Sequence, residues 1–183
     1  MGRVKQMIIV GDNLKDLMKQ YQIVDKDNCF DETCISLRMG NSILELSNKK
    51  VKTLTYGEKI PTGCIKERKI GADGIMIPPM GTILACSNEY VKMPAGYFGL
   101  IQTKGSLARL FVFIHCSDGQ VDPGYSGSLT FELFNASPFN IRIRRLEKVA
   151  NLYIFKASCK NIKSYSGKYG GFQKPTYSKA SEE

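Results

Sequence analysis

The sequence predicts an all-β protein, a β-sandwich or distorted jelly roll with one short helix near its N-terminus. Short runs rich in β-branched and aromatic residues recur along the chain, and glycine and proline turns separate them at intervals of about a dozen residues or fewer. Only residues 12–20 have the apolar spacing of an amphipathic helix. With 183 residues, the chain is long enough for one domain with a sizeable core.

The predicted helix should begin with Asp12 or Asn13 as its N-cap, because these side chains accept hydrogen bonds from free backbone N–H groups. Its apolar side chains, which should face the sheet, are Leu14, Leu17 and Met18. Residues 33–40 follow as the first predicted strand.

Residues 47–79 are polar and interrupted by glycines, so we expect variable strands and loops there. Strand character returns at residues 82–86. Pro94 and Gly96 end this region and admit the next predicted strand, residues 97–102.

Residues 104–135 contain two apolar runs around an Asp-Pro-Gly turn at 122–124. The first run, 110–116, is β-branched and aromatic, and we expect it to form a buried strand. The second, 128–135, is a predicted strand with alternating faces. One face carries Ser128, Thr130, Glu132 and Phe134. A carboxylate among apolar neighbours is costly to bury unless it is paired, so Glu132 is a candidate functional residue.

The formal net charge of +9 comes from dispersed lysines and arginines, with small groups at residues 49–50, 66–69 and 142–145. This dispersion does not favour a nucleic-acid interface, and a basic chain also attracts a nucleoside triphosphate. No apolar run has the length of a membrane span, and the N-terminus lacks the pattern of a secretory signal. We therefore expect a cytoplasmic protein without a membrane partner.

The six cysteines are scattered and form no C-x-x-C pair, which favours reduced thiols over disulfides or a metal site. The chain has one histidine, His115. Deaminases of the zinc type need H-x-E followed by P-C-x-x-C, so zinc catalysis is not expected.

Three segments at matching spacing, 106–109 (SLAR), 121–127 (VDPGYSG) and 132–135 (ELFN), resemble the core motifs of the dCTP deaminase family, the deaminating branch of the dUTPase superfamily. The motifs of that family have the form R-S-S-x-A-R, I-D-P-G-[YW]-x-G and L-E-[FL]-x-N. The similarity also extends through residues 83–101 and 167–179.

The resemblance implies a dUTPase-like domain over residues 1–160 and a flexible C-terminal arm, residues 161–183, that closes over the nucleotide. It implies a homotrimer with active sites at the subunit interfaces. Its ligand would be dCTP or dUTP, with Mg²⁺ held mainly by the triphosphate rather than by protein ligands. The implied nucleotide-binding residues are Lys104, Gly105, Ser106, Leu107, Ala108, Arg109, Asp122, Thr130, Phe131, Glu132, Tyr165, Lys168 and Gln173.

Three functions remain open for this site. A dCTP deaminase would use Glu132 as general base and then general acid to convert dCTP to dUTP and ammonia, with Arg109 paired with Glu132 or aligned on the substrate. A dUTP diphosphatase, or a bifunctional enzyme, would use Asp122 to activate water against the α-phosphate. In deaminases the same aspartate contacts the sugar 3′-hydroxyl. The third function is a catalytically silent, nucleotide-binding regulatory module. We favour the deaminase, because plain dUTPases usually lack a glutamate at the position of Glu132.

Several positions depart from the family pattern. Ser36 stands where an aspartate is usual, and Gly105 replaces a serine whose hydroxyl helps hold the reactive water. Asp118 and Gln120 stand where a small residue and often a basic one are found. The arm's glutamine is one position late, at Gln173. These departures put the support and direction of catalysis in question, not the fold.

Overall fold

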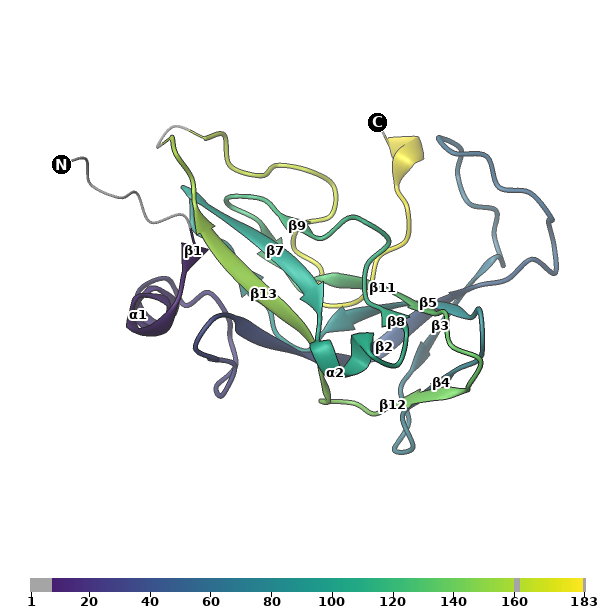
Figure 1. Cartoon of the computed structure of the whole chain (residues 1–183). Helices are drawn as coiled ribbons and strands as arrows, with labels where there is room; N and C mark the ends of the chain where they lie inside the picture. Colours follow the sequence, from purple (N-terminus) through teal and green to yellow (C-terminus); the bar gives the residue numbers. More distant parts are fainter. Residues whose placement is uncertain (1–7, 160–161, 183) are drawn as a thin grey trace.

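The computed structural model describes residues 8–159 and 162–182 and confirms an all-β architecture. Nine strands form one curled antiparallel sheet in the order β8-β11-β5-β2-β13-β7-β9, with β1 added to β13 and β3 to β2 (Figure 1). Two small sheets pair β10 with β6 and β12 with β4. The elements are β1 Ile8–Ile9, α1 Gly11–Tyr21, β2 Ile35–Leu46, β3 Ile65–Lys69, β4 Ile75–Ile77, β5 Thr82–Ser87, β6 Val91–Lys92, β7 Tyr97–Thr103, α2 Gly105–Ala108, β8 Val112–Phe113, β9 Gln120–Val121, β10 Ser126–Gly127, β11 Thr130–Asn135, β12 Ile141–Ile143, β13 Lys148–Lys156 and the 3-10 turn η1 Ala180–Glu182.

The predicted N-terminal helix is present as α1 and buries Leu14 and Leu17 against the core. Its N-cap is Val10, without a side-chain cap, so the predicted cap at Asp12 or Asn13 is wrong. The helix begins earlier because the N–H of Gly11, a residue with φ of +59°, donates to the Glu32 carbonyl at 2.7 Å. A backbone partner from the neighbouring loop thus replaces the expected side-chain cap.

The core lies inside the curl of the sheet, and β2, β11 and β13 all contribute buried side chains to it. β2 is buried along most of its length, as expected for a strand covered on both faces. β11 alternates as predicted: Phe131 and Leu133 are buried in the core, and Glu132 on the other face is half-buried. The predicted strands around residues 33–40, 82–86 and 97–102 are confirmed as β2, β5 and β7.

The predicted buried strand over residues 110–116 is much shorter than expected, and only part of the run is buried. α2 is a single helical turn, and the chain leaves it through Phe111, which has φ of +58° and is 65% exposed. Of this run, only β8, Val112–Phe113, forms a strand, and it pairs with β11. The Phe111 carbonyl accepts a hydrogen bond from the Ala136 N–H at 2.9 Å, which fixes this reversal. The side chains of Leu110, Phe111 and Phe113 therefore lie on the surface of the chain, whereas Val112 and Ile114 are buried in the core.

The described part of the arm, residues 162–182, crosses beside β9 and β11 without forming a strand (Figure 1, yellow-green to yellow). Backbone hydrogen bonds hold it: the Ser128 N–H donates to the Phe172 carbonyl at 2.8 Å, and the Gly171 N–H donates to the Ser126 carbonyl at 2.7 Å.

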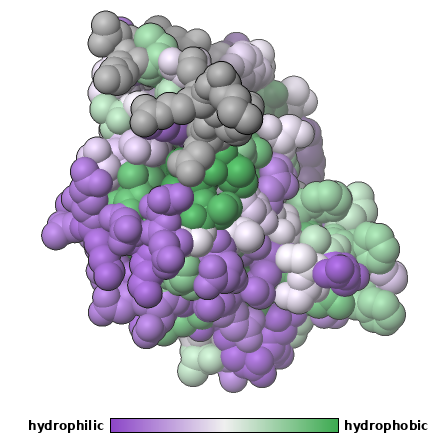
Figure 2. Space-filling model, turned by 60° about the vertical axis from the view of Figure 1, so that its left-hand side comes forward, coloured by the Kyte–Doolittle hydropathy of each residue, from purple (hydrophilic) through white to green (hydrophobic). Residues whose placement is uncertain are grey.

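On the face seen in Figure 2, hydrophilic residues gather at the lower left, and apolar residues form one area near the centre and another at the right-hand edge. Within the described ranges, no helix combines the length and apolarity needed to cross a membrane.

Candidate functional site

A cavity of about 590 Å³ lies between β11, the turn before β10 and the C-terminal arm. Glu132 and Thr130 of β11 line it, together with Asp122 of the turn and Tyr165 of the arm. Four of the predicted site residues, spread from position 122 to position 165 of the sequence, are thus brought together around one space.

Glu132 presents its carboxylate to this cavity in a fixed orientation. Its Oε2 accepts a hydrogen bond from the Cys116 N–H at 2.7 Å, and its own N–H donates to the Ile114 carbonyl at 2.8 Å. The segment 114–116 therefore anchors both the backbone and the carboxyl group of Glu132. The second oxygen, Oε1, makes no hydrogen bond to the described residues and is available to a ligand.

Asp122 is placed by the predicted turn. Its carbonyl accepts a hydrogen bond from the Tyr125 N–H at 3.0 Å, and Gly124 adopts φ of +80°, which an Asp-Pro-Gly sequence provides. The turn also contacts the arm, since the Tyr165 N–H donates to the Pro123 carbonyl at 2.8 Å. Asp122 consequently lies where β9, the turn and the arm meet.

The segment 104–109 does not line the cavity of its own chain. The Arg109 guanidinium donates to the Gly105 carbonyl at 3.1 Å, and no ion pair among the described residues joins it to Glu132. The pairing expected between these two side chains is therefore not made within a single chain.

Of the remaining predicted residues, Phe131 points its side chain into the core, and Lys168 and Gln173 do not line the cavity. Sequence reasoning missed several arm residues that do, among them Tyr169, Thr176 and Tyr177. Thr176 is docked directly: its N–H donates to Thr130 Oγ1 at 3.2 Å. The only sequence feature that pointed to these arm residues was the high density of tyrosines in the C-terminal arm.

Metal ligands do not cluster in this site. Among residues 8–159 and 162–182, no group of three or more His, Cys, Asp or Glu lies close enough together to hold a metal ion.

Comparison with known proteins agrees with this geometry. The sequence model of the family described as "dCTP deaminase-like" matches residues 8–157. The chain belongs to this family. It is 32% identical over 170 residues to the dCTP deaminase of Pyrobaculum neutrophilum, covering 90% of this chain and 92% of that protein. It is 28% identical over 182 residues to a dUMP-forming dCTP deaminase of Nanoarchaeum equitans, covering 89% and 92%.

Among solved structures, the fold matches the 2′-deoxycytidine 5′-triphosphate deaminase of Agrobacterium tumefaciens with a TM-score of 0.63 at 16% identity. The match covers 83% of this chain but about half, 47%, of the other. The dUTPase-like fold expected from the motifs is therefore confirmed.

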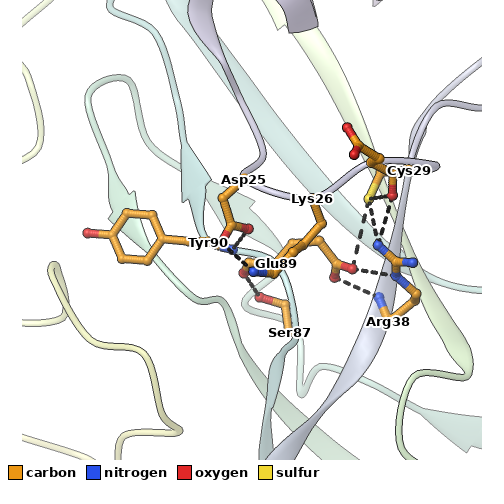
Figure 3. Close-up of polar contacts among 8 residues, drawn as sticks. Asp25, Lys26, Cys29, Arg38, Ser87, Glu89 and Tyr90 are labelled. Atoms are coloured by element: carbon orange, nitrogen blue, oxygen red, sulfur yellow. Dashed lines mark hydrogen bonds and ion pairs between the residues drawn. The ribbon is translucent and has the colours of Figure 1, made fainter.

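This member of the dCTP deaminase-like family also contains a fully buried carboxylate that sequence reasoning did not single out, Glu89 (Figure 3). Its Oε1 lies 2.6 Å from Nε of Arg38, and its Oε2 accepts a hydrogen bond from the Arg38 N–H at 2.8 Å. The Ser87 hydroxyl donates to the Glu89 carbonyl at 2.7 Å and accepts from the Leu129 N–H at 2.9 Å. Since Leu129 lines the cavity, this network of hydrogen bonds holds a backbone segment of the cavity lining in place.

The family's usual aspartate in β2 is replaced here by Ser36, which is buried. Its hydroxyl and Oδ1 of the cross-strand residue Asn151 make no hydrogen bond to the described part of the chain. The pairing of β2 with β13 is intact at this position.

Proposed function

We propose that this chain is a hydrolase that deaminates dCTP to dUTP and ammonia. The observation that carries the proposal is the Glu132 carboxylate, which is aimed into a nucleotide-sized cavity by the Cys116 N–H. Membership of the dCTP deaminase-like family and the names of its relatives support the same chemistry.

The reaction requires two proton transfers at one carbon. Glu132 removes a proton from water as the water oxygen bonds to C4 of cytosine. It then gives that proton to the amino nitrogen as the C4–N bond breaks, so ammonia leaves and the carboxylate is restored. The second proton of the water moves from the new hydroxyl to N3, which leaves the carbonyl at C4 of uracil. Such a shuttle contributes about 10²- to 10⁴-fold to a rate. The Cys116 hydrogen bond keeps one oxygen in place while the other exchanges the proton.

The triphosphate is proposed to bind outside the acidic part of the cavity. No lysine or arginine is among the described residues that line the cavity, whereas residues 104–109 present Lys104, Ser106 and Arg109 on the surface. A second copy of the chain would bring this segment to the cavity of the first. Mg²⁺ would be held mainly by the phosphate oxygens and water, as it usually is with nucleotides.

The proposed assembly is a homotrimer with sites between chains. Exposed apolar side chains lie on α2–β8 and the loop after β11, two segments joined by the Ala136 to Phe111 hydrogen bond. They are Leu110, Phe111, Phe113 and Phe139, which are 50%, 65%, 49% and 70% exposed. Burying them against another copy would remove this apolar surface from water and place Arg109 at the interface.

The arm is proposed to close the site over the nucleotide, with Tyr165, Lys168 and Gln173 among the residues that reach the ligand. Its contacts with Thr130, Ser126 and Ser128 support closure on the cavity. The proposal also places the chain in the cytoplasm, consistent with six free thiols.

A second activity is supported by Asp122. It lines the same cavity and would either contact the 3′-hydroxyl of deoxyribose or activate water against the α-phosphate. Several relatives are named as dUMP-forming, which adds weight to a bifunctional enzyme that releases pyrophosphate as well as ammonia.

The test is to incubate the purified chain with Mg²⁺ and either dCTP or dUTP, and to follow ammonia and pyrophosphate separately. Ammonia from dCTP that falls at least about 10²-fold in Glu132→Gln, but not in the loop control Glu58→Gln, supports the deaminase. Additional pyrophosphate that is lost in Asp122→Asn supports the bifunctional enzyme. Pyrophosphate from dUTP without ammonia from dCTP would overturn the deaminase. Nucleotide binding without either product would leave the regulatory module.

A further inference from the structure

Asp118 lines the cavity with Glu132, and the mechanism above gives it no role. We propose that Asp118 is a specificity residue that accepts a hydrogen bond from the exocyclic amine of cytosine, so that the cavity binds dCTP in preference to dUTP. The inference rests on the proposed deaminase function and adds the determinant of its base preference.

The charged groups of the cavity match a ligand that donates hydrogen bonds. Three carboxylates line it, those of Asp118, Asp122 and Glu132. An ionised carboxylate only accepts hydrogen bonds. Apart from its triphosphate, a dCTP molecule with its attacking water offers three donors: the water, the sugar 3′-hydroxyl and the 4-amino group. Glu132 serves the water and Asp122 is suited to the hydroxyl, which leaves Asp118 for the amine.

The turn that carries Asp118 is the turn that orients Glu132. The Cys116 N–H holds the Glu132 carboxylate, and Asp118 follows two residues later. Ser117 between them has φ of +76°, and the Gly119 carbonyl accepts a hydrogen bond from the Ile101 N–H at 2.7 Å. Because Glu132 must act on water at C4, and the amine is bonded to C4, this turn brings Asp118 to the reacting end of the base.

Uracil presents the opposite pattern at this position. Its O4 is an acceptor, so a carboxylate facing it makes no hydrogen bond and is repelled. A site that hydrogen-bonds a substrate group rejects an analogue that lacks it far more strongly than an apolar pocket does. Gln120, which also lines the cavity, cannot supply this selection because its amide both donates and accepts.

The experiment measures dissociation constants for the α,β-imido analogues of dCTP and dUTP, with Mg²⁺ present, in a Glu132→Gln background that suppresses deamination. Asp118→Asn is added to this background as a nearly isosteric change whose amide can donate to O4, and Asp16→Asn on α1 is the matched exposed control. We expect the parent to favour the dCTP analogue at least tenfold. Asp118→Asn should reduce that ratio at least tenfold, and Asp16→Asn should leave it unchanged. Turnover of dCTP by Asp118→Asn, with Glu132 restored, should show a raised KM for dCTP, because the variant loses the acceptor for the amine.

Three results would overturn the inference: a parent that binds both analogues equally, an Asp118→Asn variant that keeps the dCTP preference, or equal weakening of both analogues with a raised Mg²⁺ requirement. The last result would place Asp118 on the metal instead. Failure of the deaminase proposal looks different, because the enzyme with Glu132 intact then releases no ammonia from dCTP whatever residue occupies position 118.

Discussion

The Nε of Arg38 lies 2.6 Å from Oε1 of Glu89, and the Glu89 side chain is fully buried. Removing one partner of a buried pair leaves an uncompensated charge and typically costs about 3–5 kcal/mol. Glu89→Ala should therefore lower the free energy of unfolding by about this amount, measured by urea denaturation. The surface pair of Arg68 and Glu45, at 2.7 Å, is the control: Glu45→Ala should cost about 1 kcal/mol or less. Equal losses in the two variants would contradict the assignment of Glu89 as a structural anchor.

Two buried thiols should make the fold sensitive to alkaline pH. Burial raises the pKa of Cys29 and of Cys86 from 9.0 to about 11. The folded state thus disfavours the thiolate. The stability that these two thiols contribute is fully present below pH 9 and is lost as the pH rises toward 11. The melting temperature should fall across this window more steeply than in the Cys29→Ala/Cys86→Ala double variant. Parallel curves for the two proteins would rule out these thiols as the cause.

Cys116 should report on the charge of Glu132. It is exposed, yet partial burial and the nearby Glu132 carboxylate raise its pKa, so less thiolate is present at neutral pH. Iodoacetamide labelling, followed by mass spectrometry, should accelerate several-fold in Glu132→Gln and slow when dCTP is bound. Labelling should inactivate the enzyme. Cys116→Ser should resist inactivation by iodoacetamide, whereas Cys159→Ser, which removes the other exposed thiol, should still be inactivated. An unchanged labelling rate in Glu132→Gln would show that the charge of Glu132 does not affect the reactivity of Cys116.

Gly124 should control docking of the arm. A Cβ at this position would lie 2.7 Å from Cβ of Ser164, and its φ is +80°. Gly57 has a similar φ of +88° but nothing within 4 Å of the added atom. Alanine should cost about 1 kcal/mol of conformational strain at either site, but only Gly124→Ala should speed tryptic cleavage of the arm and raise KM. Equal protease resistance in both variants would mean that the arm tolerates the clash.

The sequence predicted those elements in which apolar and polar residues alternate with a regular local period. The alternation of Phe131, Glu132 and Leu133 is imposed by the two-residue period of a strand, and it placed Glu132 on the correct face. Arm docking was not predictable in the same way, because the backbone bond from Ser128 to Phe172 leaves no side-chain pattern. Glu89 was missed because its partner Arg38 lies 51 residues away.

The difference between the predicted strand over residues 110–116 and the shorter β8 has its own physical reason. An apolar run that lies partly on the surface has the same composition as a fully buried strand, and here the positive φ of Phe111 interrupts the extended backbone. Exposed apolar side chains of this size typically mark contacts with other proteins, so this surface predicts that the chain assembles with a partner.

We therefore expect the exposed side chains of Phe111 and Phe139 to be buried in a homotrimer. The double variant Phe111→Lys/Phe139→Lys should sediment as a monomer, because two charges cannot be buried there without partners. Deaminase activity should fall with it, since Arg109 of one chain would no longer reach Glu132 of another. Tyr56→Lys, in a loop residue that is 87% exposed, is the matched control and should keep both the trimer and the activity. A fully active monomer would refute a site shared between chains, and a trimeric double variant would place the interface on another surface.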